Sequence, residues 1–278
     1  MRVAITDFVS LANVGDDCFL WGPKSESWQR PNDPARGRLS HFDPKWGEIL
    51  LRRNELWLHQ PKWERRAVCF GSSKGAVSSW PAWVDGESKS WPFCDGDARA
   101  MAAFAMAHGA VLSPVAACAT ASHALALGAG LIGSHQADIV LAGASEAPQD
   151  ELLLAAYRNM GALSRSGVMR PFDSRRDGFV AASGGGLLLL ESEEHARNRG
   201  AKIHGFLSGW SLKCDASHMT SMSPGGASIA RAIEDALGRA GNPEIQYINA
   251  HGTATVNDGV ESRGIASVFG TRVPLSST

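Results

Sequence analysis

The chain has 278 residues, 44% hydrophobic and 20% charged, which is enough for one large domain or two small ones with a sizeable core. The net charge of -1 carries no basic excess, and this argues against nucleic acid as a partner. No segment reaches the roughly 18 apolar residues of a membrane span, and no signal peptide is visible, so we expect a cytoplasmic protein without membrane contact.

The five cysteines also limit the possible classes of site. Their number is odd and no pair has C-x-x-C spacing, so the sequence indicates neither a disulfide framework nor a zinc site. A reducing compartment fits this pattern best. We expect no metal and no cofactor.

Secondary structure is sparse at first and becomes regular from Asp97 onward. Apolar runs predict strands at 3–5 and 67–70, the second ending in a turn at 71–75. The next predicted elements are a helix at 98–108, a strand at 111–117, a helix at 119–134 and a strand at 138–143. The last strand is an unbroken apolar run, typical of a buried parallel sheet.

The second half of the chain continues this alternation. Strands are predicted at 185–191, 202–212, 245–250 and 273–277, and helices at 193–199, 228–240 and 258–269. Gly241 and Pro243 are suitable stop signals for the helix before them. Helices that alternate with buried strands indicate a layered α/β fold.

Cys118 occupies the most informative position of the chain. An apolar run, Pro114-Val115-Ala116-Ala117, leads to the thiol, and small residues with helical character follow it. This order predicts a side chain at a helix N-terminus, where unpaired N–H groups and the helix dipole favour a thiolate. The same N–H groups suit the oxyanion of an acyl transfer. The alternative is a buried structural cysteine.

Four segments in order resemble motifs of the β-ketoacyl synthases of the thiolase superfamily, from about Trp91 to Thr278. They are Ala117-Cys118-Ala119-Thr120-Ala121-Ser122-His123-Ala124, Arg170-Pro171-Phe172-Asp173-Ser174-Arg175-Arg176-Asp177-Gly178-Phe179-Val180, Asp215-Ala216-Ser217-His218-Met219-Thr220, and Tyr247-Ile248-Asn249-Ala250-His251-Gly252-Thr253-Ala254-Thr255-Val256-Asn257-Asp258. The resemblance implies a thiolase-like layered αβαβα fold with an incomplete second half. It also implies one ketosynthase-like domain over 1–278, with an N-terminal half at 1–170 that carries the nucleophile and a partial C-terminal half at 171–278.

The resemblance assigns roles to four residues. Cys118 is the nucleophile that accepts an acyl group from a carrier thioester. His251 donates a hydrogen bond to the carbonyl of the malonyl thioester during decarboxylation. Thr253 and Thr255 lie two residues apart, so on an extended stretch their hydroxyls share one side and bind the amides of a phosphopantetheine arm. A turn-stabilising role for both threonines is the alternative.

Other charged residues are expected to be structural. Asp173, Arg176 and Asp177 form a cluster that braces a loop, and Asp258 caps the helix that ends at Phe269. Glu261 matches the family carboxylate that pairs with a lysine beyond Ser276-Ser277-Thr278. Because that lysine is not part of this sequence, we expect Glu261 to be a solvated or weakly paired helix residue.

Two departures from the family pattern keep a second interpretation open. Family members have Gly-Glu-Gly after Phe-Val, whereas residues 180–186 contain no Glu. The sequence also stops before the family's lysine and its second histidine motif, so we expect these 278 residues to condense substrates inefficiently.

The first functional hypothesis is therefore an acyltransferase of fatty acid or polyketide synthesis. It would perform decarboxylative Claisen condensation with acyl and malonyl groups on acyl carrier protein, as a homodimer or a synthase heterodimer. The alternative is a non-catalytic, truncated or degenerate synthase that acts as an interaction partner, like a chain-length factor. A cysteine hydrolase is the third hypothesis, and the lack of an evident Cys-His-Asn arrangement argues against it.

Overall fold

The computed structural model describes residues 1–14, 17–21, 46–56, 63–87, 94–146, 151–218 and 222–277. The chain divides into two compact units, each built from two separate stretches. Unit 1 comprises Met1–Asp150 and Ala182–Leu207, and unit 2 comprises Glu151–Ala181 and Ser208–Thr278. The single domain with halves at 1–170 and 171–278 stays a prediction.

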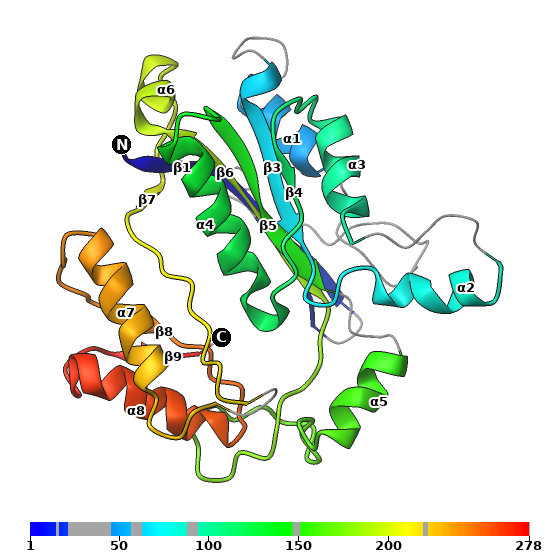
Figure 1. Cartoon of the computed structure of the whole chain (residues 1–278), viewed down its shortest axis with the longest axis vertical. Helices are drawn as coiled ribbons and strands as arrows, with labels where there is room; N and C mark the ends of the chain where they lie inside the picture. Colours follow the sequence, from blue (N-terminus) through cyan, green and yellow to red (C-terminus); the bar gives the residue numbers. More distant parts are fainter. Residues whose placement is uncertain are drawn as a thin grey trace. The chain divides into compact units, whose positions relative to one another are not determined.

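Unit 1 is built on a mixed β-sheet (Figure 1). Its strands are β1 (Val3–Val14), β2 (Asp17–Trp21), β3 (Arg66–Gly71), β4 (Val111–Leu112), β5 (Ile139–Glu146), β6 (Gly184–Ser192) and β7 (Gly205–Leu207). They are ordered β2-β1-β6-β5-β3-β4, and β7 also pairs with β1. β3, β4 and β5 run parallel to one another, whereas β6 is antiparallel to both β5 and β1.

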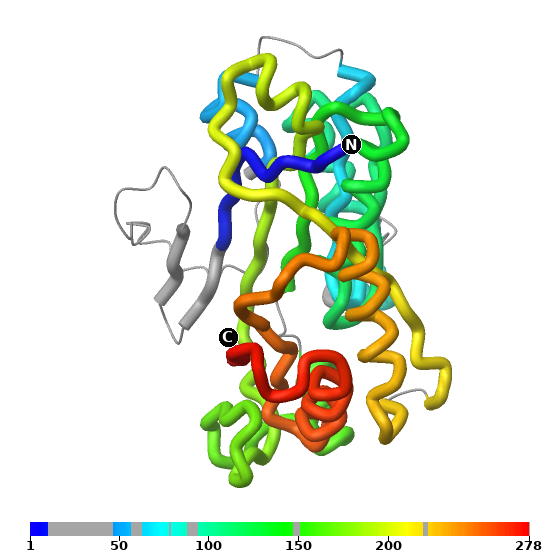
Figure 2. Tube along the Cα trace, turned by 90° about the vertical axis from the view of Figure 1, so that its left-hand side faces the viewer, coloured from blue at the N-terminus to red at the C-terminus, as the bar shows by residue number. Residues whose placement is uncertain are grey.

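The central strands bring together segments that are distant in sequence. β1, at the N-terminus, pairs with β6 from Val3↔Ser192 to Ala12↔Gly184 (Figure 2). A register shift between Ile5 and Asp7 marks an irregularity in this pairing. β6, which lies between β1 and β5 in the sheet of unit 1, therefore comes from the stretch of chain that follows residues 151–181 of unit 2.

Helices cover both faces of this sheet. The helices that pack against its strands are α1 (Trp46–Arg53), α3 (Gly96–Phe104), α4 (Thr120–Gly133) and α6 (Glu193–Asn198), whereas α2 (Trp80–Val84) lies away from the sheet (Figure 1). Successive side chains of a strand point to opposite faces. A Cβ on Gly128 of α4 would lie 3.0 Å from Val140, and one on Gly47 of α1 would lie 2.8 Å from Leu141. The predicted α/β class is confirmed, and β5 is buried on both faces as its apolar run predicted.

Several predicted elements of unit 1 are shorter than expected. The helix predicted at 98–108 ends at Phe104, and Met106 then takes a left-handed φ of 47°. The strand predicted at 111–117 stops at Leu112, because Pro114 has no N–H to donate to a ladder. The strand predicted at 202–212 is confined to β7.

Unit 2 contains three helices and a small parallel sheet among its described residues. These are α5 (Glu151–Asn159), α7 (Ala227–Arg239), α8 (Asn257–Phe269), β8 (Ile248–Asn249) and β9 (Leu275–Ser276). The sequence predicted α7 and α8 to within one residue but missed α5. Gly264 allows α7 and α8 to approach closely, since a Cβ there would lie 2.7 Å from Ile229. No helix of the described residues is long and apolar enough to cross a membrane.

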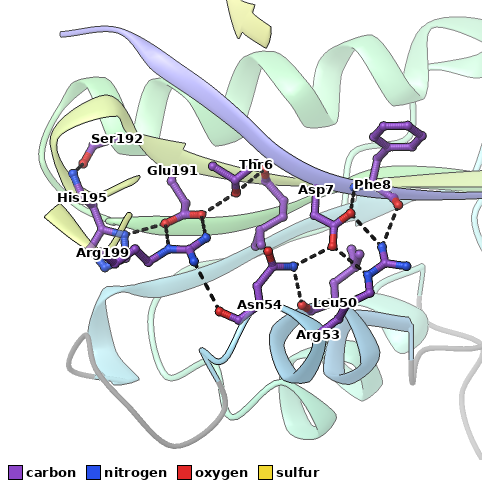
Figure 3. A network of polar contacts seen from close by, with 11 residues as sticks. Thr6, Asp7, Phe8, Leu50, Arg53, Asn54, Glu191, Ser192, His195 and Arg199 are labelled. Carbon is purple, nitrogen blue, oxygen red and sulfur yellow. Dashed lines mark hydrogen bonds and ion pairs between the residues drawn. The ribbon is translucent and has the colours of Figure 1, made fainter. Parts of the chain in front are cut away.

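A buried carboxylate, Glu191 of β6, is the centre of a hydrogen-bond network in unit 1 (Figure 3). Arg199 donates to both of its oxygens, at 2.8 Å from Nε and 2.5 Å from Nη2. His195 Nδ1 lies 2.6 Å from Oε2, and the Thr6 hydroxyl donates to Oε1. Burial by itself raises the pKa of Glu191, but the hydrogen bonds from Arg199, His195 and Thr6 outweigh it and lower the pKa to about 2.

A second carboxylate, Asp7 of β1, extends this network to α1 (Figure 3). Arg53 donates to both oxygens of Asp7, at 2.8 and 2.7 Å, and Asn54 donates to Oδ2 at 2.6 Å. Arg199 also donates to the carbonyl of Asn54 at 3.3 Å. The two acids thus tie α1 and α6 to neighbouring strands, at the edge where the parallel strands begin.

We predict that Glu191→Gln lowers the free energy of unfolding by about 2–3 kcal/mol. Breaking a fully buried ion pair costs about 3–5 kcal/mol, and the effect here is smaller because the Arg199 side chain is 21% exposed. Urea denaturation followed by circular dichroism measures the change. Glu193→Gln is the matched control, since among the described residues Glu193 pairs with the exposed Arg2 and Arg197 and its loss should cost under about 0.5 kcal/mol.

The same pair predicts how stability depends on pH. The pKa of Glu191 is lower in the folded chain than its ordinary value of about 4.3, so its contribution is complete above that value. The contribution disappears as pH falls through about 2. The native chain should therefore lose more stability between pH 5 and pH 2.5 than Glu191→Gln does, and equal losses would contradict the assignment.

Candidate active site

Cys118 lies in a single turn of 3-10 helix, Ala117–Ala119, directly before α4. Cys118 is exposed, so it is not a buried structural cysteine. Ala117, immediately before it, has a left-handed φ of 49°. The chain therefore turns sharply at the thiol, as the sequence predicted, although the segment that enters the turn is irregular rather than a strand.

The turn at Cys118 lies at the edge of the sheet where the parallel strands end. Gly71, the last residue of β3, is packed so tightly there that a Cβ would lie 2.0 Å from the carbonyl oxygen of Pro114. Residues at this edge of an α/β sheet are the ones that commonly face ligands. The Glu191 network belongs to the opposite edge, since Glu191 pairs with Ile139 at the start of β5.

The N-terminus of α4 has no side-chain cap. No side chain caps the helix at Ala119, so the N–H groups of the first turn are not taken by an N-cap side chain. His123 is directed to the helix itself, with Nδ1 3.0 Å from the carbonyl oxygen of Ala119. Cys118 thus sits beside the positive end of a 14-residue helix, an environment that favours a thiolate.

His251 belongs to unit 2 and follows β8. The residue is exposed, and its backbone N–H donates to Oε1 of Glu261 at 2.7 Å. The N–H of Gly252 donates to Oε2 of the same carboxylate at 2.9 Å. The expectation that Glu261 is solvated or weakly paired is wrong, because its two oxygens bridge consecutive amides of the loop that carries His251.

Thr253 and Thr255 have hydroxyl oxygens 2.9 Å apart. The stretch between them is not extended, since Ala254 has a left-handed φ of 57°, so the side chains meet across a tight turn. The N–H of Asn257 donates to the Thr255 hydroxyl at 3.2 Å. These contacts bear out the turn-stabilising alternative, and they also place both hydroxyls in one small polar cluster.

Asp258 is the buried centre of this cluster. Its Oδ1 accepts the N–H of Thr255 at 3.3 Å, and its Oδ2 accepts the N–H of Phe172 at 2.8 Å. Thr255 and Asp258 have the spacing of a capping box, so Asp258 caps the start of α8 from the first turn rather than from the N-cap position.

The arginine- and aspartate-rich loop holds the His251 loop from a second side. Arg176 Nε donates to the carbonyl oxygen of Thr255 at 2.7 Å, and the N–H of Gly178 donates to that of Ala254 at 2.8 Å. A Cβ on Gly252 would lie 2.8 Å from the Phe172 ring, so only glycine fits there. The bracing role predicted for Arg176 agrees with these contacts.

The two aspartates of the arginine- and aspartate-rich loop stabilise the loop itself. Asp173 accepts three hydrogen bonds from Arg175, which hold the pKa of Asp173 well below its usual range. Asp177 accepts the Ser164 hydroxyl at 2.7 Å and the N–H of Ser166 at 3.0 Å, and these bonds lower its pKa. Both carboxylates are therefore ionised acceptors with structural roles.

The structure assigns the four predicted site residues to two places. Cys118 is in unit 1, whereas His251, Thr253 and Thr255 share one loop of unit 2. Among the described residues, no group of three or more His, Cys, Asp or Glu side chains could hold a metal ion. Sequence reasoning missed Glu261 as a brace, and no sequence signal would have revealed it, since the bond joins a side chain to two backbone amides.

Comparison with known proteins decides the family. Residues 59–196 match the profile described as "Beta-ketoacyl synthase, N-terminal domain", and residues 204–278 match "Beta-ketoacyl synthase, C-terminal domain". The chain belongs to the β-ketoacyl synthase family. The resemblance inferred from the four sequence motifs is thereby confirmed.

Individual relatives agree with this assignment. This β-ketoacyl synthase chain is 40% identical over 177 residues to the 3-oxoacyl-[acyl-carrier-protein] synthase 2 of Rhizobium meliloti (strain 1021), a match that covers 60% of this chain and 42% of the relative. The chain thus spans less than half of the curated relative's length.

Solved structures match over nearly the whole chain. A β-ketoacyl synthase from Burkholderia phymatum STM815 has a TM-score of 0.80 and 28% identity, over 99% of this chain and 80% of that one. A type II polyketide synthase acyl-carrier protein in complex with its ketosynthase, bound to the hexaketide, has a TM-score of 0.79 and 25% identity over 99% and 80%. The predicted thiolase-like α/β fold is confirmed.

We predict that Glu261→Gln loosens the His251 loop. A glutamine side chain has only one acceptor oxygen, so one of the two amide N–H groups loses its partner, at a cost of about 1 kcal/mol at this partly exposed site. Hydrogen-exchange mass spectrometry of a peptide covering 247–255 measures the loosening as faster exchange. Glu234→Gln on the exposed side of α7 is the control and should leave that peptide unchanged.

Proposed function

We propose that the chain has 3-oxoacyl-[acyl-carrier-protein] synthase-type acyltransferase activity, with Cys118 as the nucleophile. The observation that carries the proposal is the exposed thiol of Cys118 in a strained turn at the start of α4. The Cys118 thiolate attacks the thioester carbonyl of an acyl group on acyl carrier protein. The bond from that carbonyl carbon to the carrier sulfur breaks, and the carrier thiol leaves with a proton.

The condensation step uses His251. A malonyl group on acyl carrier protein loses carbon dioxide, and the resulting carbanion attacks the thioester on Cys118. His251 stabilises the enolate by donating a hydrogen bond to the malonyl thioester carbonyl. The product is a 3-oxoacyl carrier thioester, and the Cys118 thiolate is regenerated. The N–H groups of His251 and Gly252 donate to Glu261, and these bonds hold the backbone of His251 while its side chain donates to the substrate.

Thr253 and Thr255 bind the phosphopantetheine arm in this proposal. Each hydroxyl has one donor and two acceptor sites, so the pair retains capacity for the arm's amides beyond the contacts within the turn. The substrates belong to fatty acid or polyketide synthesis, and the protein acts as a homodimer or a synthase heterodimer. We assign it to the cytoplasm, since a cysteine nucleophile must stay reduced and that compartment keeps thiols reduced.

Acyl loading tests the proposal directly. The native chain, Cys118→Ala and Cys214→Ala are incubated with acyl-loaded acyl carrier protein, and the acylated peptide is located by mass spectrometry. We expect loading on the native chain and on Cys214→Ala, and none on Cys118→Ala. Loading at another cysteine would remove Cys118 from its role.

The second step has its own variant. His251→Ala should load at the native rate yet lower formation of the 3-oxoacyl product by about a hundredfold, the usual cost of losing one donor to a developing oxyanion. The measurement follows product release with malonyl-loaded carrier protein. A variant that condenses at the native rate would contradict the role of His251.

The non-catalytic alternative makes a different prediction in the same assay. A chain-length-factor-like partner would take no acyl group at Cys118 but would change the chain length of the products of an active synthase to which it binds. The exposed thiol favours the enzyme over this alternative.

A further inference from the structure

The turn that presents Cys118 contains a backbone conformation that the sequence would not choose by itself. Ala117 has a φ of 49°, in the left-handed region that is costly for a residue with a Cβ. Ala116 before it has a φ of −140° and Thr120 after the turn a φ of −54°, both ordinary values. Such a conformation persists only where surrounding contacts enforce it.

One hydroxyl group contacts both sides of Ala117. Thr120 Oγ1 donates to the carbonyl oxygen of Ala117 at 2.8 Å, and it accepts the N–H of Ala116 at 2.9 Å. The Thr120 side chain is buried, so these bonds do not exchange freely with water. The hydroxyl therefore closes a ring around the strained residue that precedes Cys118.

The sheet fixes the direction of this hydroxyl. A Cβ on Gly71 would lie 3.1 Å from the Thr120 methyl carbon, so that methyl group packs directly over the backbone at the end of β3. A β-branched side chain has few rotamers. With its methyl group held against Gly71, Thr120 aims its hydroxyl at the turn.

We propose that Thr120 is a positioning residue for Cys118, which rests on the proposed function of that thiol. Its hydroxyl holds Ala117 in the left-handed conformation, and this conformation sets the direction of the Cys118 side chain and its N–H at the start of α4. Without the hydroxyl, the turn relaxes and the thiol leaves the position where the helix favours its thiolate.

Two variants of Thr120 test this role in the full-length chain. Thr120→Val keeps the shape but removes the hydroxyl, whereas Thr120→Ser keeps the hydroxyl. The rate of Cys118 alkylation by iodoacetamide is measured from pH 5 to pH 9 by peptide mass spectrometry, with the exposed Cys214 as internal reference. We expect Thr120→Val to slow alkylation near neutral pH about tenfold and to move its pH profile upward, while Thr120→Ser stays near the native chain.

Three outcomes of these measurements overturn the proposal. Alkylation of Thr120→Val with the native rate and pH profile shows that the hydroxyl does not position Cys118. Alkylation of Thr120→Ser as slow as that of Thr120→Val shows that a hydroxyl at this position is not enough to position Cys118. A role confined to stability would change the unfolding temperature of Thr120→Val without moving the pH profile, and this also overturns it.

If Thr120→Val does not fold, a measurement on the native chain still tests the proposal. The Ala116 amide, which donates to Thr120 Oγ1, should exchange slowly with solvent, and fast exchange overturns the proposal. Alkylation needs no acyl carrier, so it also separates two failures. If the native chain takes no acyl group, the proposed function is contradicted. The alkylation rates of the Thr120 variants still decide the role of the hydroxyl.

Discussion

The close approach of Gly71 to Pro114 is the constraint on which the geometry around Cys118 depends. A single added carbon at Gly71 would lie 2.0 Å from a backbone oxygen, so the end of β3 and the segment entering the turn are held in contact. This contact places the Thr120 methyl group, and through it the hydroxyl that braces Ala117. Contacts that begin at the buried end of β3 thus determine the position of the exposed thiol.

The two loops that carry the candidate site residues are built on the same physical principle. Ala117 and Ala254 both have left-handed backbones, and each is held by threonine hydroxyls close in sequence. A glycine without room for a side chain supports each loop, Gly71 in unit 1 and Gly252 in unit 2. Strain concentrated beside functional residues is stable only when neighbouring groups enforce it.

Carboxylates in this protein act mainly as acceptors for backbone and arginine donors. Glu261, Asp258 and Asp177 each accept backbone N–H groups of loops, while Glu191 binds Arg199 deep in unit 1. A charged acceptor strengthens such bonds, and an ionised carboxylate offers several acceptor positions at once. Acidic residues therefore define loop shape here, and the candidate chemistry is assigned to a thiol and an imidazole.

The sequence by itself determined the α/β class, the helices α4, α7 and α8, the position of Cys118 before a helix and the family. These follow from local patterns, because apolar periodicity and motif order need no distant partner. Tertiary structure decided where the Glu261 carboxylate binds and which hydroxyl braces Ala117. Each of those depends on contacts between groups whose relative position the chain acquires only by folding, such as Gly71 against Thr120.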